Sequence, residues 1–291
     1  MQGTVDGFSY GLVTPLVAFV MACLGAALGL RCTTRSLRAE RSFKAGWLAL
    51  GATSIGSGIW TMHFVAMMGF TVREAPVGYD KPITFASLAL AIVMVGIGIF
   101  IVGYRGATRM ALITGGVIMG LGVASMHYLG MAGMRFQGQF EYDTVTVALS
   151  VVIAVVAATT ALWAAVSIHG FLPSLGASVV MGVAVSGMHY TGMAALSVHL
   201  HPAVKTAAAA GGDTPASLLV PMLVGPCCFL LLAGVVVMFD PLVVMGTPER
   251  AAYAPGRAVH GAGRQSVIPA QRGYAPHRTP VERGSRVPRN R

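Results

Sequence analysis

The chain has 291 residues, of which 55% are hydrophobic and only 10% carry a charged side chain. A soluble globular domain has about 25% charged residues, so this composition excludes that class and indicates a membrane protein. The net charge of +10 raises the question of nucleic acid, but most of it lies where positive charge meets anionic lipid headgroups, and we predict no nucleic-acid partner.

Seven apolar runs follow one another along the chain, and each is long enough for a helix that crosses a bilayer, which needs about 20 residues. None of the runs has Asp, Glu, Lys or Arg in its interior. The sequence therefore predicts an all-α, polytopic protein with seven transmembrane helices, over roughly residues 8–30, 45–70, 82–104, 110–134, 144–168, 171–197 and 217–239.

The basic residues indicate the orientation of these helices. If the N-terminus lies outside, only Arg73, Lys81, Arg135 and Lys205 of the 20 Lys and Arg residues fall on the outer side. Positive residues collect in cytoplasmic loops, so we predict a multi-pass protein of the cell membrane with the N-terminus outside and the C-terminus in the cytoplasm. Residues 241–291, rich in Arg, Gly and Pro, are predicted to form a disordered cytoplasmic tail after a membrane domain over residues 1–240.

Three Met-His dipeptides, offset by about 60 residues, mark an internal repeat. A glycine stands seven positions before each His, an aromatic residue follows it directly, a small residue comes three positions later and a Met four positions later. We interpret this as three repeated two-helix units, spans 1–2, 3–4 and 5–6, with the seventh helix left over. The dipeptides are Met62-His63, Met126-His127 and Met188-His189.

The three histidines are expected at one depth. Spans 2, 4 and 6 all run from inside to outside, and each His lies about seven residues before its span ends, which is about 10 Å below the outer end. The glycine seven positions earlier lies on nearly the same helix face, and small residues let membrane helices approach closely. The His faces should therefore turn toward neighbouring helices.

The residue types around each His suit a soft metal ion. The Met four residues later shares a helix face with the His, whereas the Met before it points about 100° away. Thioethers suit Cu(I), imidazole suits copper, zinc and iron, and no carboxylate is near, so we predict a copper site. The candidate ligands are His63, Met67, His127, Met131, His189 and Met193, with Met62, Met126 and Met188 as further candidates.

Other interpretations stay open at this point. The histidines could form a polar network that joins the repeats, with the Tyr128 and Tyr190 hydroxyls as partners. A copper-handling or transport protein is a second alternative, since Pro173, Pro221 and Pro226 interrupt spans 6 and 7.

A haem-binding membrane oxidoreductase is a third alternative, although an odd number of histidines at one depth fits facing axial pairs less well. His199 and His201, in the outer loop before span 7, could feed or cap the site.

The third motif copy, Met188-His189-Tyr190-Thr191, resembles the motif of the MHYT family of bacterial integral membrane sensor domains. The resemblance covers residues 7 to about 240 and all three copies, and the first copy departs from it at Phe64 and Ala66. It implies seven spans with the motifs near the outer face, bound copper, and sensing of a diatomic ligand such as O2, CO or NO.

Many members of this family carry a cytoplasmic output module, such as a diguanylate cyclase or a histidine kinase. The polar segment after residue 240 is too short for such a module. We therefore expect that the protein is not an enzyme and that it signals through a separate cytoplasmic or membrane partner.

Overall fold

The computed structural model describes residues 4–7, 9–72, 77–136, 138–168, 170–200 and 215–239. The tail predicted to be disordered and His201 lie outside these residues, and the domain boundary at residue 240 stays a prediction. The helices in the described part are α1 (Val13–Arg38), α2 (Arg41–Met68), α3 (Lys81–Arg105), α4 (Arg109–Ala132), α5 (Thr144–Ser167), α6 (Phe171–Ala194) and α7 (Pro215–Met238).

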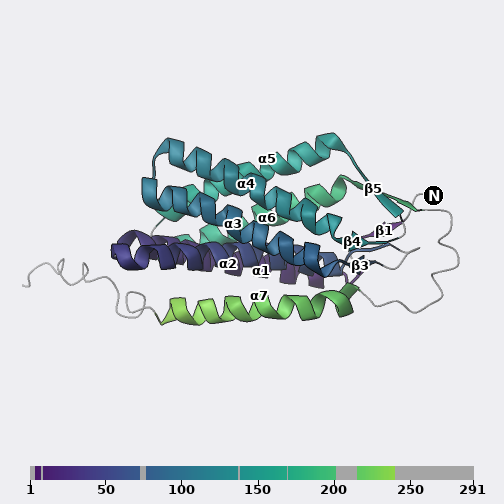
Figure 1. Cartoon of the computed structure of the whole chain (residues 1–291), viewed down its shortest axis with the longest axis horizontal. Helices are drawn as coiled ribbons and strands as arrows, with labels where there is room; N and C mark the ends of the chain where they lie inside the picture. The colour runs from purple at the N-terminus through teal and green to yellow at the C-terminus, as the bar shows by residue number, and fades with distance from the viewer. Residues whose placement is uncertain are drawn as a thin grey trace, which may run out of the picture. The chain divides into compact units, whose positions relative to one another are not determined.

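Six of the helices form a closed ring of three pairs. Within each repeat the two helices pack on each other, α1 on α2, α3 on α4 and α5 on α6. Neighbouring repeats are joined by α2 against α3 and by α4 against α5, and α6 returns to pack on α1. The seventh helix, α7, packs against α2 and α1 (Figure 1). This arrangement agrees with the predicted three helix pairs and one further helix.

The glycines seven residues before each His allow neighbouring repeats to approach closely. A Cβ on Gly56 of α2 would lie 2.9 Å from the Ile92 backbone of α3, and one on Gly120 of α4 would lie 2.5 Å from the Val155 backbone of α5. A Cβ on the third glycine, Gly182 of α6, would overlap the side chain of Cys23 in α1. Each glycine therefore contacts the first helix of the next repeat, as the pattern of small residues predicts.

Six of the predicted transmembrane spans are confirmed as helices long and apolar enough to cross a membrane: α1, α3, α4, α5, α6 and α7. The remaining helix, α2, is not among them, so the seventh span over residues 45–70 stays a prediction. Nearly every residue of α2 from Ser54 to Met67 is buried, and α1, α3 and α7 all pack on it. A helix covered by other helices can carry Ser, Thr and Gly because few of its side chains face lipid.

The first predicted span, residues 8–30, is wrong at both ends. The helix begins only at Val13, because Gly11 has a positive φ of 59° that ends any helical conformation before it. At its other end α1 continues to Arg38. The residues after position 30, which are predicted to form a basic loop, therefore belong to the helix. The Arg31 guanidinium, seven residues before the end of α1, lies 5.1 Å from the centre of the ring of Phe171, the first residue of α6, in a cation–π contact.

Three two-stranded antiparallel sheets cap one end of the ring, and the all-α prediction misses them. Each sheet joins the segment before a repeat's first helix to the segment after its second helix, and the strands gather at one end of the bundle (Figure 1). The cap thus repeats three times, like the helices. The pairs are β1 (Val5–Asp6) with β2 (Thr71–Val72), β3 (Gly78–Tyr79) with β4 (Met134–Arg135), and β5 (Gly138–Tyr142) with β6 (Leu196–Leu200).

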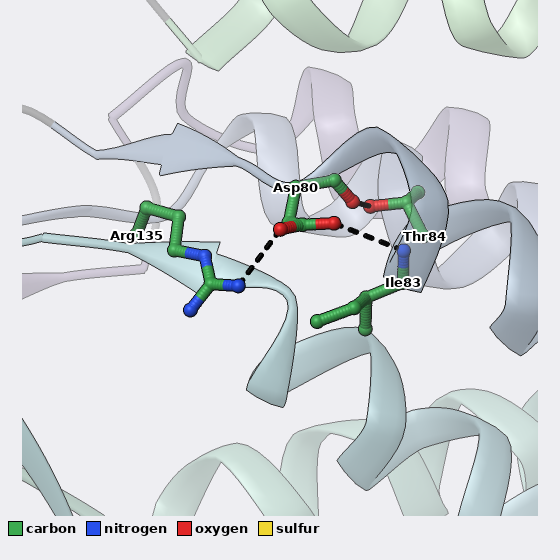
Figure 2. A network of polar contacts seen from close by, with 4 residues as sticks. All are labelled: Asp80, Ile83, Thr84 and Arg135. Carbon is green, nitrogen blue, oxygen red and sulfur yellow. Dashed lines mark hydrogen bonds and ion pairs between the residues drawn. The ribbon is translucent and has the colours of Figure 1, made fainter.

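Asp80 connects the second sheet to the start of α3. Its carboxylate accepts a hydrogen bond from the backbone N–H of Ile83 at 3.1 Å and one from Nη2 of Arg135 in β4 at 2.7 Å (Figure 2). The hydrogen bond from Arg135, followed by the one from Ile83, lowers the pKa of the Asp80 carboxyl below its ordinary value. One side chain therefore caps a helix and pairs with the neighbouring strand.

Candidate metal centre

The three motif histidines lie at one level, just beneath the strand cap. His63 lies in α2, His127 in α4 and His189 in α6, and each is five residues before the last residue of its helix. Five residues correspond to about 7.5 Å of helix, somewhat less than the sequence analysis expects. All three side chains are at most 2% exposed. The predicted convergence of the three repeats at one depth is therefore present in the fold.

The imidazole rings face one another through their Nδ1 atoms. Nδ1 of His63 lies 3.1 Å from Nδ1 of His127 and 3.1 Å from Nδ1 of His189, and the third distance, between His127 and His189, is 3.3 Å. The ring planes stand nearly perpendicular to one another, at 81° to 90°, with centroids 4.9 to 5.1 Å apart. We call this group the His triad.

Hydrogen bonds among the three rings cannot satisfy all three Nδ1 atoms. A neutral imidazole nitrogen either holds a hydrogen or offers a lone pair. With no hydrogen at the centre three lone pairs face one another, and with two hydrogens two donors compete for one acceptor. A cation at the centre would be bound by all three lone pairs at once.

The size of the triad fits a metal ion of the first transition series. Nitrogens separated by 3.1, 3.1 and 3.3 Å lie about 1.8 Å from their common centre, slightly less than the ~2.0 Å of a zinc–nitrogen bond. The Nε2 atoms on the far side of His63 and His127 are buried, and in the described part of the chain neither has a hydrogen-bond partner. The donor geometry at the centre therefore suits a metal ion, whose identity the geometry does not specify.

The aromatic residue after each histidine packs edge-on against that histidine. Ring centroids are 4.6 Å apart for His63 and Phe64, 4.8 Å for His127 and Tyr128, and 4.9 Å for His189 and Tyr190. The Tyr128 hydroxyl lies 2.7 Å from Oγ of Ser150 in α5. Tyr128 thus joins α4 to α5 through Ser150, and the contacts among the histidines join the three repeats, which is also what the polar-network alternative expects.

The candidate methionines lie in two kinds of environment. Met62, Met126 and Met188, which precede the histidines, are fully buried in the core, as is Met131. Met67, which is buried, and Met193, which is partly exposed, line a cavity together with His189. Their role as metal ligands stays a prediction.

Two glycines contact the triad directly, and the motif spacing alone predicts no role for them at the site. A Cβ on Gly130 would lie 2.6 Å from Nε2 of His63, and one on Gly192 would lie 2.5 Å from Nε2 of His127. The signal that could reveal them is the small residue three positions after each histidine. This signal does not reveal which histidine each glycine contacts, because that histidine belongs to another repeat.

His199 lies on the strand cap, away from the triad. It belongs to β6, and its Nε2 is 2.8 Å from a carboxylate oxygen of Glu141 in β5, with both side chains largely exposed. The suggestion that it feeds or caps the site therefore has no contact with the triad to support it.

Comparison with known proteins agrees with the repeat. The model of the MHYT family, described as a bacterial signalling protein N terminal repeat, matches residues 56–115, 120–178 and 182–239, which is well over half of the chain. The chain belongs to the MHYT family. Each matched segment begins at the glycine seven positions before a triad histidine, so the family repeat and the repeat found here have the same period.

Several curated relatives are bacterial signalling proteins. The chain is 38% identical over 192 residues to the bifunctional diguanylate cyclase/cyclic di-GMP phosphodiesterase MucR of Pseudomonas aeruginosa, covering 64% of this chain and 28% of that protein. It is 36% identical over 208 residues to the cyclic di-GMP phosphodiesterase NbdA of the same species, covering 67% and 26%. It is 30% identical over 200 residues to signaling protein YkoW of Bacillus subtilis, covering 66% and 24%. No solved structure matches the chain.

These relatives correct the prediction that the protein is not an enzyme. That prediction took the short polar segment after residue 240 as its reason. Two relatives that share the membrane domain are named as enzymes, and the chain spans only about a quarter of their length. The region of similarity is the MHYT-like part, so the length of the segment that follows it here excludes no output domain.

Proposed function

We propose that the chain is a membrane sensor domain in which the His triad binds a soft metal ion, with copper as the first candidate. The observation that carries the proposal is that each of the three repeats contributes one buried imidazole, with the three Nδ1 atoms within 3.3 Å of one another. Burying three histidines inside a membrane protein costs free energy, and such residues commonly mark a functional site.

Copper is favoured by the donors around the triad. The buried cluster contains three imidazoles and no carboxylate, and the nearby methionines add soft sulfur atoms. Imidazole alone would suit zinc, copper and iron, whereas thioethers select Cu(I). In this proposal the histidines are the principal ligands, and the sulfur atoms of Met62, Met67, Met126, Met131, Met188 and Met193 supply further contacts.

The proposed stimulus is either the metal ion itself or a diatomic gas. A metal ion held by three protein ligands keeps a position at which O2, CO or NO can bind. The triad histidines belong to three different helix pairs, so a change in their spacing changes the packing of α2, α4 and α6 together. A ligand shifts this packing only if it binds one arrangement more tightly than the other.

The proposed output is control of a bacterial signalling activity on the cytoplasmic side. Relatives with this domain are named for cyclic di-GMP synthesis or breakdown, which makes that messenger the first candidate. The proposal includes the orientation predicted from the basic residues, with the strand cap and the triad near the outer face and seven spans in the cell membrane.

The alternatives receive less support. A haem with two axial imidazoles needs a planar slot between them, whereas the triad rings are 4.9 to 5.1 Å apart in a perpendicular arrangement around one point. Of the prolines that suggested a transporter, Pro173 lies in the first turn of α6, where a helix tolerates proline. Pro221 and Pro226 lie inside α7, and α7 packs on α1 and α2 rather than contributing a triad histidine.

Metal analysis tests the proposal. The protein is purified without oxygen, given copper, zinc or iron, and compared with a variant in which His63, His127 and His189 are changed to Ala. We expect stoichiometric copper in the unmodified protein and none in the variant. The His199→Ala variant is the matched control, because it removes a histidine from the strand cap and should keep the metal.

Equal metal content in all three proteins would contradict the proposal. If the triple variant does not fold, the His127→Gln variant serves in its place, since it removes one triad nitrogen while filling a similar volume. A monodisperse profile in size-exclusion chromatography shows which variants are folded.

A further inference from the structure

Glycines close two corners of the His triad. Gly130, three residues after the second-repeat histidine, covers Nε2 of His63, and Gly192, three residues after the third-repeat histidine, covers Nε2 of His127. At both places a Cβ would come within 2.6 Å of the ring nitrogen, so no atom larger than hydrogen fits between helix and ring. Passage of an ion at these two corners would require the helices to separate.

The third corner differs, because the first repeat has Ala66 where the other repeats have glycine. Ala66 and His189 line one cavity of ≈ 320 Å³, and neither of the other two histidines belongs to its wall. A methyl group at this position cannot make the close contact that glycine makes, so the ring and the helix leave space between them. Of the three triad histidines, His189 therefore faces this cavity.

The residues that line this cavity include two methionines, whose sulfur atoms can bind a soft metal ion. Met67 is fully buried beside the triad, whereas Met193 is partly exposed and is followed by the exposed Ala194. The remaining wall residues are Gly7, Phe70 and Tyr190, so among the residues that the structure describes no carboxylate and no ammonium group lines the cavity. Two sulfur atoms thus lie along the way to the one imidazole that the cavity reaches.

We propose that this cavity is the route by which a soft monovalent cation, Cu(I) in chemical type, reaches and leaves the His triad. Met193 is the outer ligand, Met67 the inner ligand and His189 the first imidazole. Neutral thioethers bind soft cations and offer little to hard ones such as Ca²⁺ or Mg²⁺, so the route also selects the ion. This inference rests on the proposed function, since it requires a triad that binds metal.

Exchange kinetics test the route. Protein loaded with Cu(I) is mixed with an excess of a water-soluble Cu(I) chelator, and the formation of the coloured complex is followed with time. In the Met67→Leu/Met193→Leu variant we expect copper loading and removal to slow about tenfold, as for a barrier raised by about 1.4 kcal/mol. Leucine is close to methionine in volume, so the fold should persist.

The matched control is Met119→Leu, which changes a buried methionine of α4 that is not a candidate ligand and does not line the cavity. It should exchange copper at the rate of the unmodified protein.

Exchange at the unmodified rate in the double variant would overturn the route. Equal slowing of exchange in the double variant and in Met119→Leu would also overturn it, because Met119 does not line the cavity. Failure of the proposed function is a distinct result, in which the unmodified protein holds no copper at equilibrium.

Discussion

The imidazoles of His63 and His127 rest on glycine backbone, where any larger residue would overlap them. The sequence shows a small residue near each histidine, and the role it predicts for that residue is to let neighbouring helices pack closely. The contact itself joins residues 65 or more positions apart in different repeats, and no periodicity within one repeat reveals such a pair. For the same reason the open corner at Ala66 could be noticed in the sequence only as a departure from the motif.

Changing Gly192 to Ala should displace the His127 ring. A Cβ at this position would lie 2.5 Å from Nε2, and forcing extra atoms into a packed interior costs about 1–3 kcal/mol. We expect a lower thermal midpoint of unfolding and a loss of bound metal, measured on the detergent-purified protein.

The control for that change lies in the same helix. Gly187 of α6 is exposed and has no atom near the position of a Cβ, so Gly187→Ala should stabilise the helix by up to about 1 kcal/mol and keep the metal. Equal behaviour of the two alanine variants would show that the glycine at position 192 does not support the ring.

Among the elements, the helices were predictable and the strand cap was not. Long apolar runs mark the helices, whereas strands such as β1 and β3 have two residues each and are too short to show an alternating pattern. Gly11 likewise gave no sign that the first helix starts only at Val13, because a positive φ cannot be read from a single glycine in the sequence.

The contact between Asp80 and Arg135 should make the second sheet sensitive to acid. The pKa of Asp80 is lower in the folded protein than its ordinary value of 3.8, so its contribution to stability is complete above that pH and is lost as the pH falls through the lower folded value. The thermal midpoint of the unmodified protein should therefore fall toward that of Asp80→Asn as the pH is lowered.

Arg135→Gln separates the two roles of Asp80, since it removes the ion pair and leaves the helix cap with Ile83. It should lower the thermal midpoint at neutral pH less than Asp80→Ala does. A gap between the unmodified protein and Asp80→Asn that stays constant down to the lowest pH would contradict the assignment of this acid sensitivity to Asp80.

For the whole molecule, the triplicated sequence was informative because identical positions in identical helix pairs come to equivalent places. That is why His63, His127 and His189 could be expected at one level. The closure of the ring, by contrast, depends on a contact between Gly182 and Cys23, which are far apart in the sequence. It also depends on the packing of several helices around α2. These long-range contacts have no local signal in the chain.

The proposed orientation makes a prediction about labelling in intact cells. A cysteine introduced at the exposed Gln139 of the strand cap should react with a membrane-impermeant maleimide from outside. One at the exposed Ala107, between α3 and α4, should react only after the membrane is permeabilised. The unmodified chain, whose free cysteines lie within α1 and α7, measures the background, and the reverse pattern would invert the orientation.

The convergence of three imidazoles on one ion is tested most directly by X-ray absorption at the copper edge of the loaded protein. The account predicts three nitrogen neighbours per copper at ~2.0 Å, with the outer-shell scattering of three imidazole rings, and fewer rings in His127→Gln. A spectrum with one imidazole or none, or one unchanged in the His127→Gln variant, would contradict it.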